Sequence, residues 1–203
     1  MGCGVVAMSD LELYFTQQNS GYKAPHQSIN YNESDGLISK SDYMDYAEYN
    51  RDFVYKLLAH PVSYVGGVAP WDMENEMGYY LKENGYPYQS VNWEPTSNSN
   101  LLIQKIKAMI DNGIPVVFSY DDSEPLFMYG SIEQAKTASE EAFDNYCRSH
   151  YMTIIGYTKY LKEDGKTYGY ILKIVSWGNI YYVNYDQYTK TWLDFTSNIL
   201  EIK

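Results

Sequence analysis

Residues 112–120 read Asn-Gly-Ile-Pro-Val-Val-Phe-Ser-Tyr, and at this stretch the 203-residue chain changes character. Asn112-Gly113 is typical of a helix end, and the run after it is apolar and led by β-branched residues, as in a buried strand. We therefore expect a helical part over about 1–113 and a mainly β part over about 114–203. Helices followed by an antiparallel sheet predict an α+β fold.

The segments before residue 114 carry helical patterns. In the first, Cys3, Ala7, Leu11 and Tyr14 fall on one helical face, so a helix is expected to begin just after Gly2. Residues 19–38 are polar and Gly-rich, which predicts a loop. Three further helices are expected at Ser41 to about Ala59, Trp71 to Glu83, and Asn98 to Asp111.

After residue 114 the pattern favours strands. A strand over 114–120 and a loop over 121–130 are followed by a helix over 131–146, with Ser131 as its cap and Gln134 three residues on. Strands are then expected over 150–157, 168–176 and 180–185. Trp177-Gly178-Asn179 joins the last two strands.

Composition limits the classes of partner. The formal net charge of −11 and the lack of a Lys/Arg cluster disfavour nucleic acid and anionic membrane surfaces. No apolar run approaches the ~18 residues of a membrane span. An apolar fraction of 45% argues against disorder, and the length fits a single domain over 1–203. We therefore expect a folded domain that binds neither nucleic acid nor membrane.

Cys3 is the first candidate for chemistry. A helix N-terminus favours the thiolate, which is the nucleophilic form of cysteine, and Gly2 and Gly4 leave room for a substrate backbone. The Cys3 N–H would be free to donate to a developing oxyanion. The alternative is an inert cysteine packed on an apolar helix face.

His150 is the second candidate. At the start of a strand its imidazole could face a cleft and act as the base that takes a thiol proton. His26 in a polar loop and His60 before Pro61 look like surface or capping residues. The alternative for His150 is a hydrogen-bonded edge histidine without a catalytic role.

Ser176 is the third candidate. A catalytic imidazole needs an orienting group, usually on an adjacent strand, and Ser176 is the polar residue that ends the strand over 168–176. A hairpin turn with a packed Trp explains Ser176-Trp177-Gly178 equally well. Cysteine, histidine and this turn nevertheless follow one another in the order expected of a thiol hydrolase.

Four blocks together resemble a known family: Gly2-Cys3-Gly4-Val5-Val6-Ala7-Met8, Asn112-Gly113-Ile114-Pro115-Val116-Val117, His150-Tyr151-Met152-Thr153-Ile154-Ile155-Gly156-Tyr157, and Ser176-Trp177-Gly178 with Tyr181-Tyr182-Val183. The chain resembles papain-like cysteine peptidases, and within them the bacterial branch related to the C39-like peptidases that process bacteriocin leaders. The resemblance implies a papain-like fold, a helical lobe packed on an antiparallel sheet, with Cys3 as nucleophile and His150 as its base.

The chain departs from the family pattern at two points. Family members carry a Gln or substitute donor several residues before the cysteine, and this chain starts too late to hold one. The family's third residue is an Asn or Asp, and that position is Val175 here, so the role is carried to the neighbouring Ser176 although adjacent strand residues point to opposite faces. A catalytically impaired module that binds peptide or protein, and a thiol acyltransferase, therefore stand as alternatives to a peptidase.

No metal or organic cofactor is expected. Cys147 and His150 have the spacing of a zinc-ligand pair, but the chain offers no matching second pair. If Cys3 meets His150, Cys147 could form an inactivating disulfide with Cys3; the alternative is a bystander thiol. The expected partner is a peptide or protein substrate, and a missing upstream segment together with an acidic, tyrosine-rich composition favours export.

Overall fold

A computed structural model of the chain describes residues 3–18, 39–57, 68–94, 98–190 and 199–203. The chain divides into two compact units, residues 1–92 with 202–203 and residues 93–201. Each unit is described by itself. The expected loop over 19–38, the end of the second expected helix near Ala59, and His26 and His60 lie outside the described residues.

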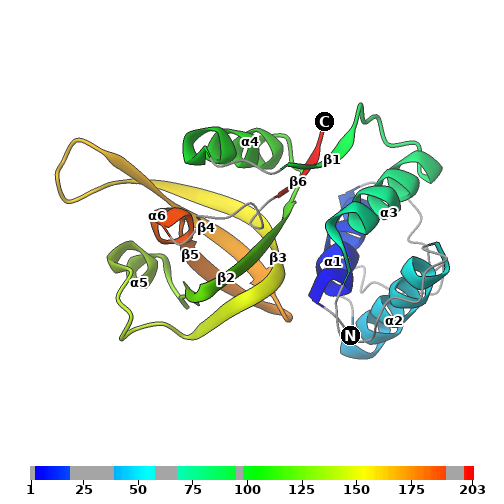
Figure 1. Cartoon of the computed structure of the whole chain (residues 1–203), viewed down its shortest axis with the longest axis horizontal. Helices are drawn as coiled ribbons and strands as arrows, with labels where there is room; N and C mark the ends of the chain where they lie inside the picture. Colours follow the sequence, from blue (N-terminus) through cyan, green and yellow to red (C-terminus); the bar gives the residue numbers. More distant parts are fainter. Residues whose placement is uncertain (1–2, 19–38, 58–67, 95–97, 191–198) are drawn as a thin grey trace. The chain divides into compact units, whose positions relative to one another are not determined.

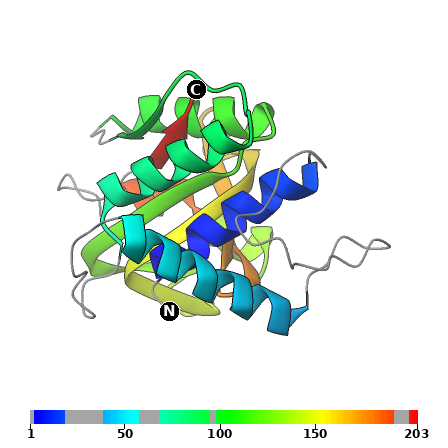
Figure 2. The same cartoon turned by 90° about the vertical axis from the view of Figure 1, so that its right-hand side faces the viewer.

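The first unit contains three helices that pack against one another: α1 (Cys3–Gln18), α2 (Lys40–Leu57) and α3 (Pro70–Glu83) (Figures 1 and 2). All three predicted helices are present, and α1 begins at Cys3 as its periodicity predicts. Pro70 occupies the first turn of α3, where a missing N–H costs nothing. Ala7 and Leu11 of α1 are buried, as expected for the apolar face of this helix.

Hydrogen bonds from tyrosines connect the three helices. The Tyr80 hydroxyl on α3 donates to the Glu12 carbonyl oxygen on α1 at 3.0 Å. From α2, the Tyr43 hydroxyl donates to Asp10 Oδ1 at 2.8 Å, and the Tyr46 hydroxyl donates to the Glu12 carboxylate. Buried polar groups of α1 thus obtain partners from both neighbouring helices.

The Glu76 carboxyl on α3 differs from these groups. It is 1% exposed, and neither of its oxygens has a hydrogen-bond partner among the described residues. Burial, followed by repulsion from Glu12 and Asp72, raises the pKa of Glu76 well above its usual value. The folded state therefore keeps Glu76 protonated at a pH at which the unfolded chain has released this proton. As the pH rises above the range in which the unfolded carboxyl titrates, Glu76 lowers the stability of the folded state.

The chain forms a six-stranded sheet with the order β1-β6-β2-β3-β4-β5, which belongs to the second unit except for Val91, Asn92 and Ile202. The strands are β1 (Val91–Glu94), β2 (Val116–Met128), β3 (Asn145–Leu161), β4 (Tyr168–Ser176), β5 (Asn179–Asn184) and β6 (Ile199–Ile202). The pairs β2–β3, β2–β6, β3–β4 and β4–β5 are antiparallel. The predicted α+β class with an antiparallel sheet is therefore confirmed.

Helix α4 (Ser99–Asp111) belongs to this second unit and packs on β2 and β3. Asn98 caps it, accepting from the Leu101 N–H at 3.1 Å. Lys105 of α4 forms ion pairs with Glu94 on β1 and Glu201 on β6, each at 3.0 Å. The boundary between the compact units lies between Asn92 and Trp93. It precedes the change from helical to β pattern, which the sequence shows at about residue 114.

Helix α6 (Tyr185–Lys190) packs against β4 and β5, and the curled sheet surrounds it (Figure 1). The Tyr188 ring meets Phe118 at 5.6 Å and Tyr120 at 6.1 Å, both on β2. These aromatic contacts fill the space between α6 and the sheet. None of the helices that the structure describes has the length and apolar character needed to cross a membrane.

Two predictions between residues 121 and 146 are wrong. The expected loop over 121–130 is strand, because β2 continues to Met128 and resumes pairing with β3 after an irregularity between Asp121 and Leu126. The expected helix over 131–146 is only α5 (Ile132–Thr137), ended by the left-handed Ala138 at φ 49°. Ser131 caps it as predicted, accepting from the Gln134 N–H at 3.3 Å. Pairing of 145–149 with β2 overrides the local helical pattern.

Replacement of Glu76 by Met tests the cost of the buried carboxyl. We expect Glu76→Met to raise the free energy of unfolding by about 1–3 kcal/mol at pH 8, because it removes a buried polar group without a partner. The gain should shrink towards pH 4, where the carboxyl is protonated in both states. Urea denaturation at several pH values measures this. Glu83→Met at an exposed position of the same helix is the control and should show no such pH dependence.

Candidate active site

The register between β3 and β4 places His150 and Ser176 on one face of the sheet. Ile154 lies opposite Ile174, and opposite residues share a face. Every second residue of a strand lies on the same face. His150 therefore shares the face of Ile154 and Ser176 shares the face of Ile174, whereas Val175 points to the other face. The polar residue that shares a face with His150 is therefore Ser176.

A hydrogen bond joins the two side chains. His150 Nε2 and Ser176 Oγ are 2.8 Å apart, and Ser176 is 3% exposed. When Nε2 carries the proton, it donates to the serine hydroxyl, and Nδ1 is left as an acceptor. In that tautomer the imidazole can take a proton from a thiol.

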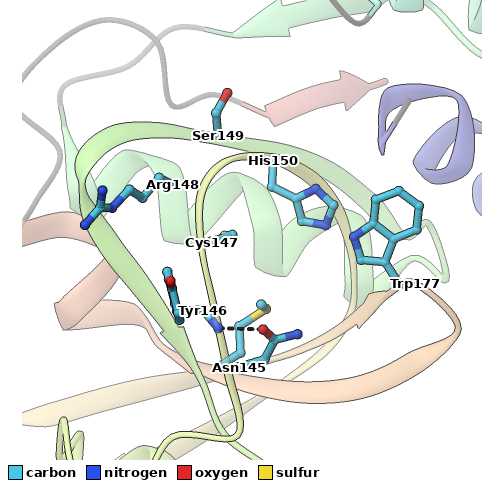
Figure 3. Close-up of a pocket in the computed structure, with 8 residues that line it drawn as sticks. Asn145, Tyr146, Cys147, Arg148, Ser149, His150 and Trp177 are labelled. Carbon is cyan, nitrogen blue, oxygen red and sulfur yellow. Dashed lines mark hydrogen bonds between the residues drawn. The ribbon is translucent and has the colours of Figure 1, made fainter. Parts of the chain in front are cut away.

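The Trp177 indole covers the imidazole. The rings of His150 and Trp177 stack with centroids 5.5 Å apart and planes 12° from parallel (Figure 3). Burial lowers the pKa of His150 below its usual value, since the charged imidazolium loses solvation. The neutral, basic form of His150 is thereby favoured near neutral pH.

An unusual turn holds the indole in place. Trp177 has φ 51° and Gly178 has φ 75°, and Ser176 pairs with Asn179 across the hairpin. Two central residues with positive φ define a type I′ turn, which favours Asn-Gly and disfavours a bulky first residue. Trp177 occupies a costly backbone position, and strain of this kind gathers at functional sites.

A cavity of about 530 Å³ adjoins His150. It is lined by Met128, Asn145, Tyr146, Cys147, Arg148, Ser149, His150 and Trp177 (Figure 3). In Figure 3 the His150 and Trp177 side chains point towards each other, while the Arg148 guanidinium points away from them. The volume of the cavity is in the usual range of ligand pockets, about 300–1,000 Å³.

Cys3 is the first residue of α1 and is half-buried in the first unit. His150 and Ser176 lie in the second unit. The structure therefore brings together two of the three residues singled out from the sequence, and the pairing of Cys3 with His150 stays a prediction. Cys147 lines the cavity beside His150 and is a free thiol, as is Cys3.

Asn145 and Tyr146 are cavity residues that the sequence analysis missed. The local pattern predicts a helix for their segment, whereas in the structure they belong to β3, the strand that leads to His150. Trp177 was noted only as a packed turn residue. No group of three or more His, Cys, Asp or Glu side chains within the described ranges is arranged to hold a metal ion.

The model of the Peptidase_C39 like family matches residues 1–198. The chain belongs to this family. Its membership supports a papain-like fold and a function of the cysteine-peptidase type, with a peptide or protein as the substrate class. No curated protein and no solved structure matches the chain.

Replacement of Trp177 by Asn tests the cover over the imidazole in this C39-like protein. We expect Trp177→Asn to raise the pKa of His150, because the imidazolium regains solvent, while Asn-Gly suits the type I′ turn. NMR titration of the His150 ring measures the pKa. Trp177→Phe retains a stacked ring and should leave the pKa depressed; an unchanged pKa in Trp177→Asn would show that the indole does not desolvate His150.

Proposed function

We propose that the chain is a cysteine peptidase in which Cys3 is the nucleophile, His150 is the general base and acid, and Ser176 orients His150. The observation that carries the proposal is the 2.8 Å contact between His150 Nε2 and Ser176 Oγ beneath the Trp177 ring. Family membership and the position of Cys3 at the start of α1 support it. In this proposal the two units are lobes of a single papain-like domain over 1–203.

The proposed reaction forms and then hydrolyses a thioester. His150 takes the Cys3 thiol proton, and the thiolate sulfur attacks the peptide carbonyl carbon to give a tetrahedral oxyanion. The oxyanion collapses, the C–N bond breaks, and the imidazolium gives its proton to the leaving amine. Water, deprotonated by His150, then attacks the thioester, which releases the acid product and the thiol.

The neutral form of His150 suits the first step. Since burial lowers the pKa of His150, the imidazole can accept the thiol proton at neutral pH. At the start of α1, the unpaired N–H groups of the first helical turn favour negative charge on sulfur. The proposed pair thus combines a desolvated base with a thiol at an electropositive helix end.

Serine is a weaker orienting group than a carboxylate. Its hydroxyl fixes the ring through a neutral hydrogen bond, with a net value of about 0.5–1.5 kcal/mol. The second candidate function, a peptide-binding module with impaired catalysis, is favoured by the same departure, because Val175 stands at the position of the family's Asn or Asp and only the hydroxyl of Ser176 is left to orient His150. Thiol reactivity separates the two functions.

Alkylation by iodoacetamide tests the nucleophile. We expect Cys3 to be modified at pH 6 at least tenfold faster than Cys147, because only Cys3 has both the helix N-terminus and the proposed base. His150→Ala should remove most of that difference. Mass spectrometry of the modified peptides measures both rates, with Cys147→Ser as the control variant. Equal rates at the two cysteines would favour the impaired binding module.

Removal of the Ser176 hydroxyl tests the orienting group. We expect Ser176→Ala to lower the rate of Cys3 alkylation and of casein cleavage about tenfold, the equivalent of one neutral hydrogen bond. Ser176→Asn should restore much of the rate, because an amide can also accept from Nε2. Val175→Ala on the opposite face is the matched control and should leave both rates within twofold of those of the natural chain.

A further inference from the structure

The cavity beside His150 differs in charge from the molecule as a whole. The chain has a formal net charge of −11, with 26 acidic and 15 basic side chains. None of the residues that line this cavity is acidic, and one of them, Arg148, carries a permanent positive charge. The cavity is therefore a positively charged site in an acidic protein.

A second cavity in the same unit has the opposite composition. Its volume is about 420 Å³, and its lining includes the carboxylates of Glu124, Glu140 and Asp186. The cation in this lining, Lys136, forms an ion pair with Glu133 at 2.7 Å. The lack of acidic side chains is therefore specific to the first cavity.

The Arg148 guanidinium is free to bind a ligand. No hydrogen bond or ion pair joins it to another of the residues that the structure describes. Two carboxylates close to it in the chain or the sheet are directed elsewhere. Asp144 accepts from the Gly130 N–H, and Asp121 lies opposite Ser149, on the other face of the strand from Arg148. Distant charges are screened over about 10 Å at 0.1 M salt, so the net charge of the chain does little to offset a cation that a ligand touches directly.

Arg148 and His150 serve different parts of the cavity. Both belong to β3, and since two residues separate them along a strand, their Cα atoms are about 7 Å apart. In Figure 3 the guanidinium is directed away from the imidazole and from the Trp177 ring. A group bound to Arg148 therefore lies to one side of the atoms on which His150 would act. This position suits the selection of a substrate rather than the stabilisation of its oxyanion.

The chemistry of the guanidinium specifies the ligand. Its planar group presents paired N–H donors that match the two oxygens of a carboxylate. Asn145, Tyr146 and Ser149 add further N–H and O–H groups to the lining. Met128 and the half-exposed Trp177 ring provide apolar surface for the carbon chain that carries the carboxylate. In a peptide, carboxylates are the anionic groups that fit such a site.

We propose that Arg148 binds a carboxylate of the peptide substrate and makes the chain selective for acidic peptides. The proposal rests on the proposed function, for which it narrows the substrate class. An Asp or Glu side chain and a free C-terminus present the same chemistry to the guanidinium. Peptides that contain only one of these carboxylates distinguish the two sources.

Peptide binding to the Cys3→Ala protein tests the proposal without the need for turnover. The probes are pools of acetylated hexapeptide amides with Glu at one position in turn and neutral residues elsewhere, each matched by a pool with Gln at that position. Neutral hexapeptides with a free or an amidated C-terminus test the other source. At low ionic strength we expect one acidic pool to bind the immobilised protein about fivefold more tightly than its neutral match, as an exposed ion pair allows.

Mass spectrometry of the retained peptides measures this ratio. The preference should disappear in 0.5 M NaCl, because salt screens the pair. Equal retention of every acidic pool and its neutral match at low ionic strength would overturn the proposal.

Substitutions of Arg148 assign the preference to its side chain. Arg148→Gln should bring the ratio of acidic to neutral peptide binding to about one, and Arg148→Glu should reverse it in favour of pools that carry Lys. The matched control is Lys166→Gln, which removes one positive charge at an exposed position of the turn between β3 and β4 and should leave the ratio unchanged. The ratio is taken within each variant, so a loss of folded protein does not imitate a loss of selectivity. A preference that survives Arg148→Gln, or one that Lys166→Gln removes equally, would show that the guanidinium is not the binding group.

The outcomes are separable from those of the proposed function. A preference for acidic peptides that depends on Arg148, in a chain whose Cys3 is unreactive, supports the carboxylate site and removes the peptidase. Reactive Cys3 and cleaved casein without such a preference retain the peptidase and overturn the carboxylate site. If no pool is retained and casein stays intact, both proposals are wrong.

Discussion

The register between β3 and β4 is the constraint on which the candidate site depends. It aligns Ile154 with Ile174; four residues back along β3 lies His150, and two residues on along β4 lies Ser176. A slip by one residue would turn every side chain of one strand to the other face and present Val175 to the imidazole. Because Ile154 and Ile174 are fully buried, such a slip would also expose apolar surface. Core packing therefore holds the 2.8 Å contact between His150 and Ser176 in place.

The partners that the structure describes for the His150 ring are uncharged. Its orienting partner is a buried hydroxyl and its cover is an indole, so desolvation is not offset by a neighbouring carboxylate. Such surroundings keep the imidazole neutral and able to accept a proton. The cover depends on Trp177 staying in a left-handed conformation that its side chain disfavours, within a hairpin fixed by the pairing of Ser176 with Asn179. The conformation of this one turn therefore affects the pKa of His150.

The difference in length between β3 and β4 links the site to its surroundings. The turn at Trp177-Gly178 ends β4, whereas β3 continues to Asn145 and remains paired with β2. The strand that carries His150 consequently extends past its neighbour β4 and stays paired with β2 along its first residues. A sequence pattern does not reveal this arrangement, because 145–149 lacks the apolar alternation of a strand and its first two residues end the helical pattern of 131–146. Its strand conformation comes from pairing with residues distant in sequence.

The sequence by itself determined the helix that begins at Cys3, the cap Ser131, the antiparallel sheet and the α+β class, because local periodicity and capping chemistry suffice for these features. It also pointed to His150 and Ser176 as candidates. Tertiary structure alone decided that Ser176 rather than Val175 faces His150, that Trp177 stacks on the ring, and that β3 extends past β4. These features depend on cross-strand register and turn geometry, which arise only when segments far apart in the chain pair.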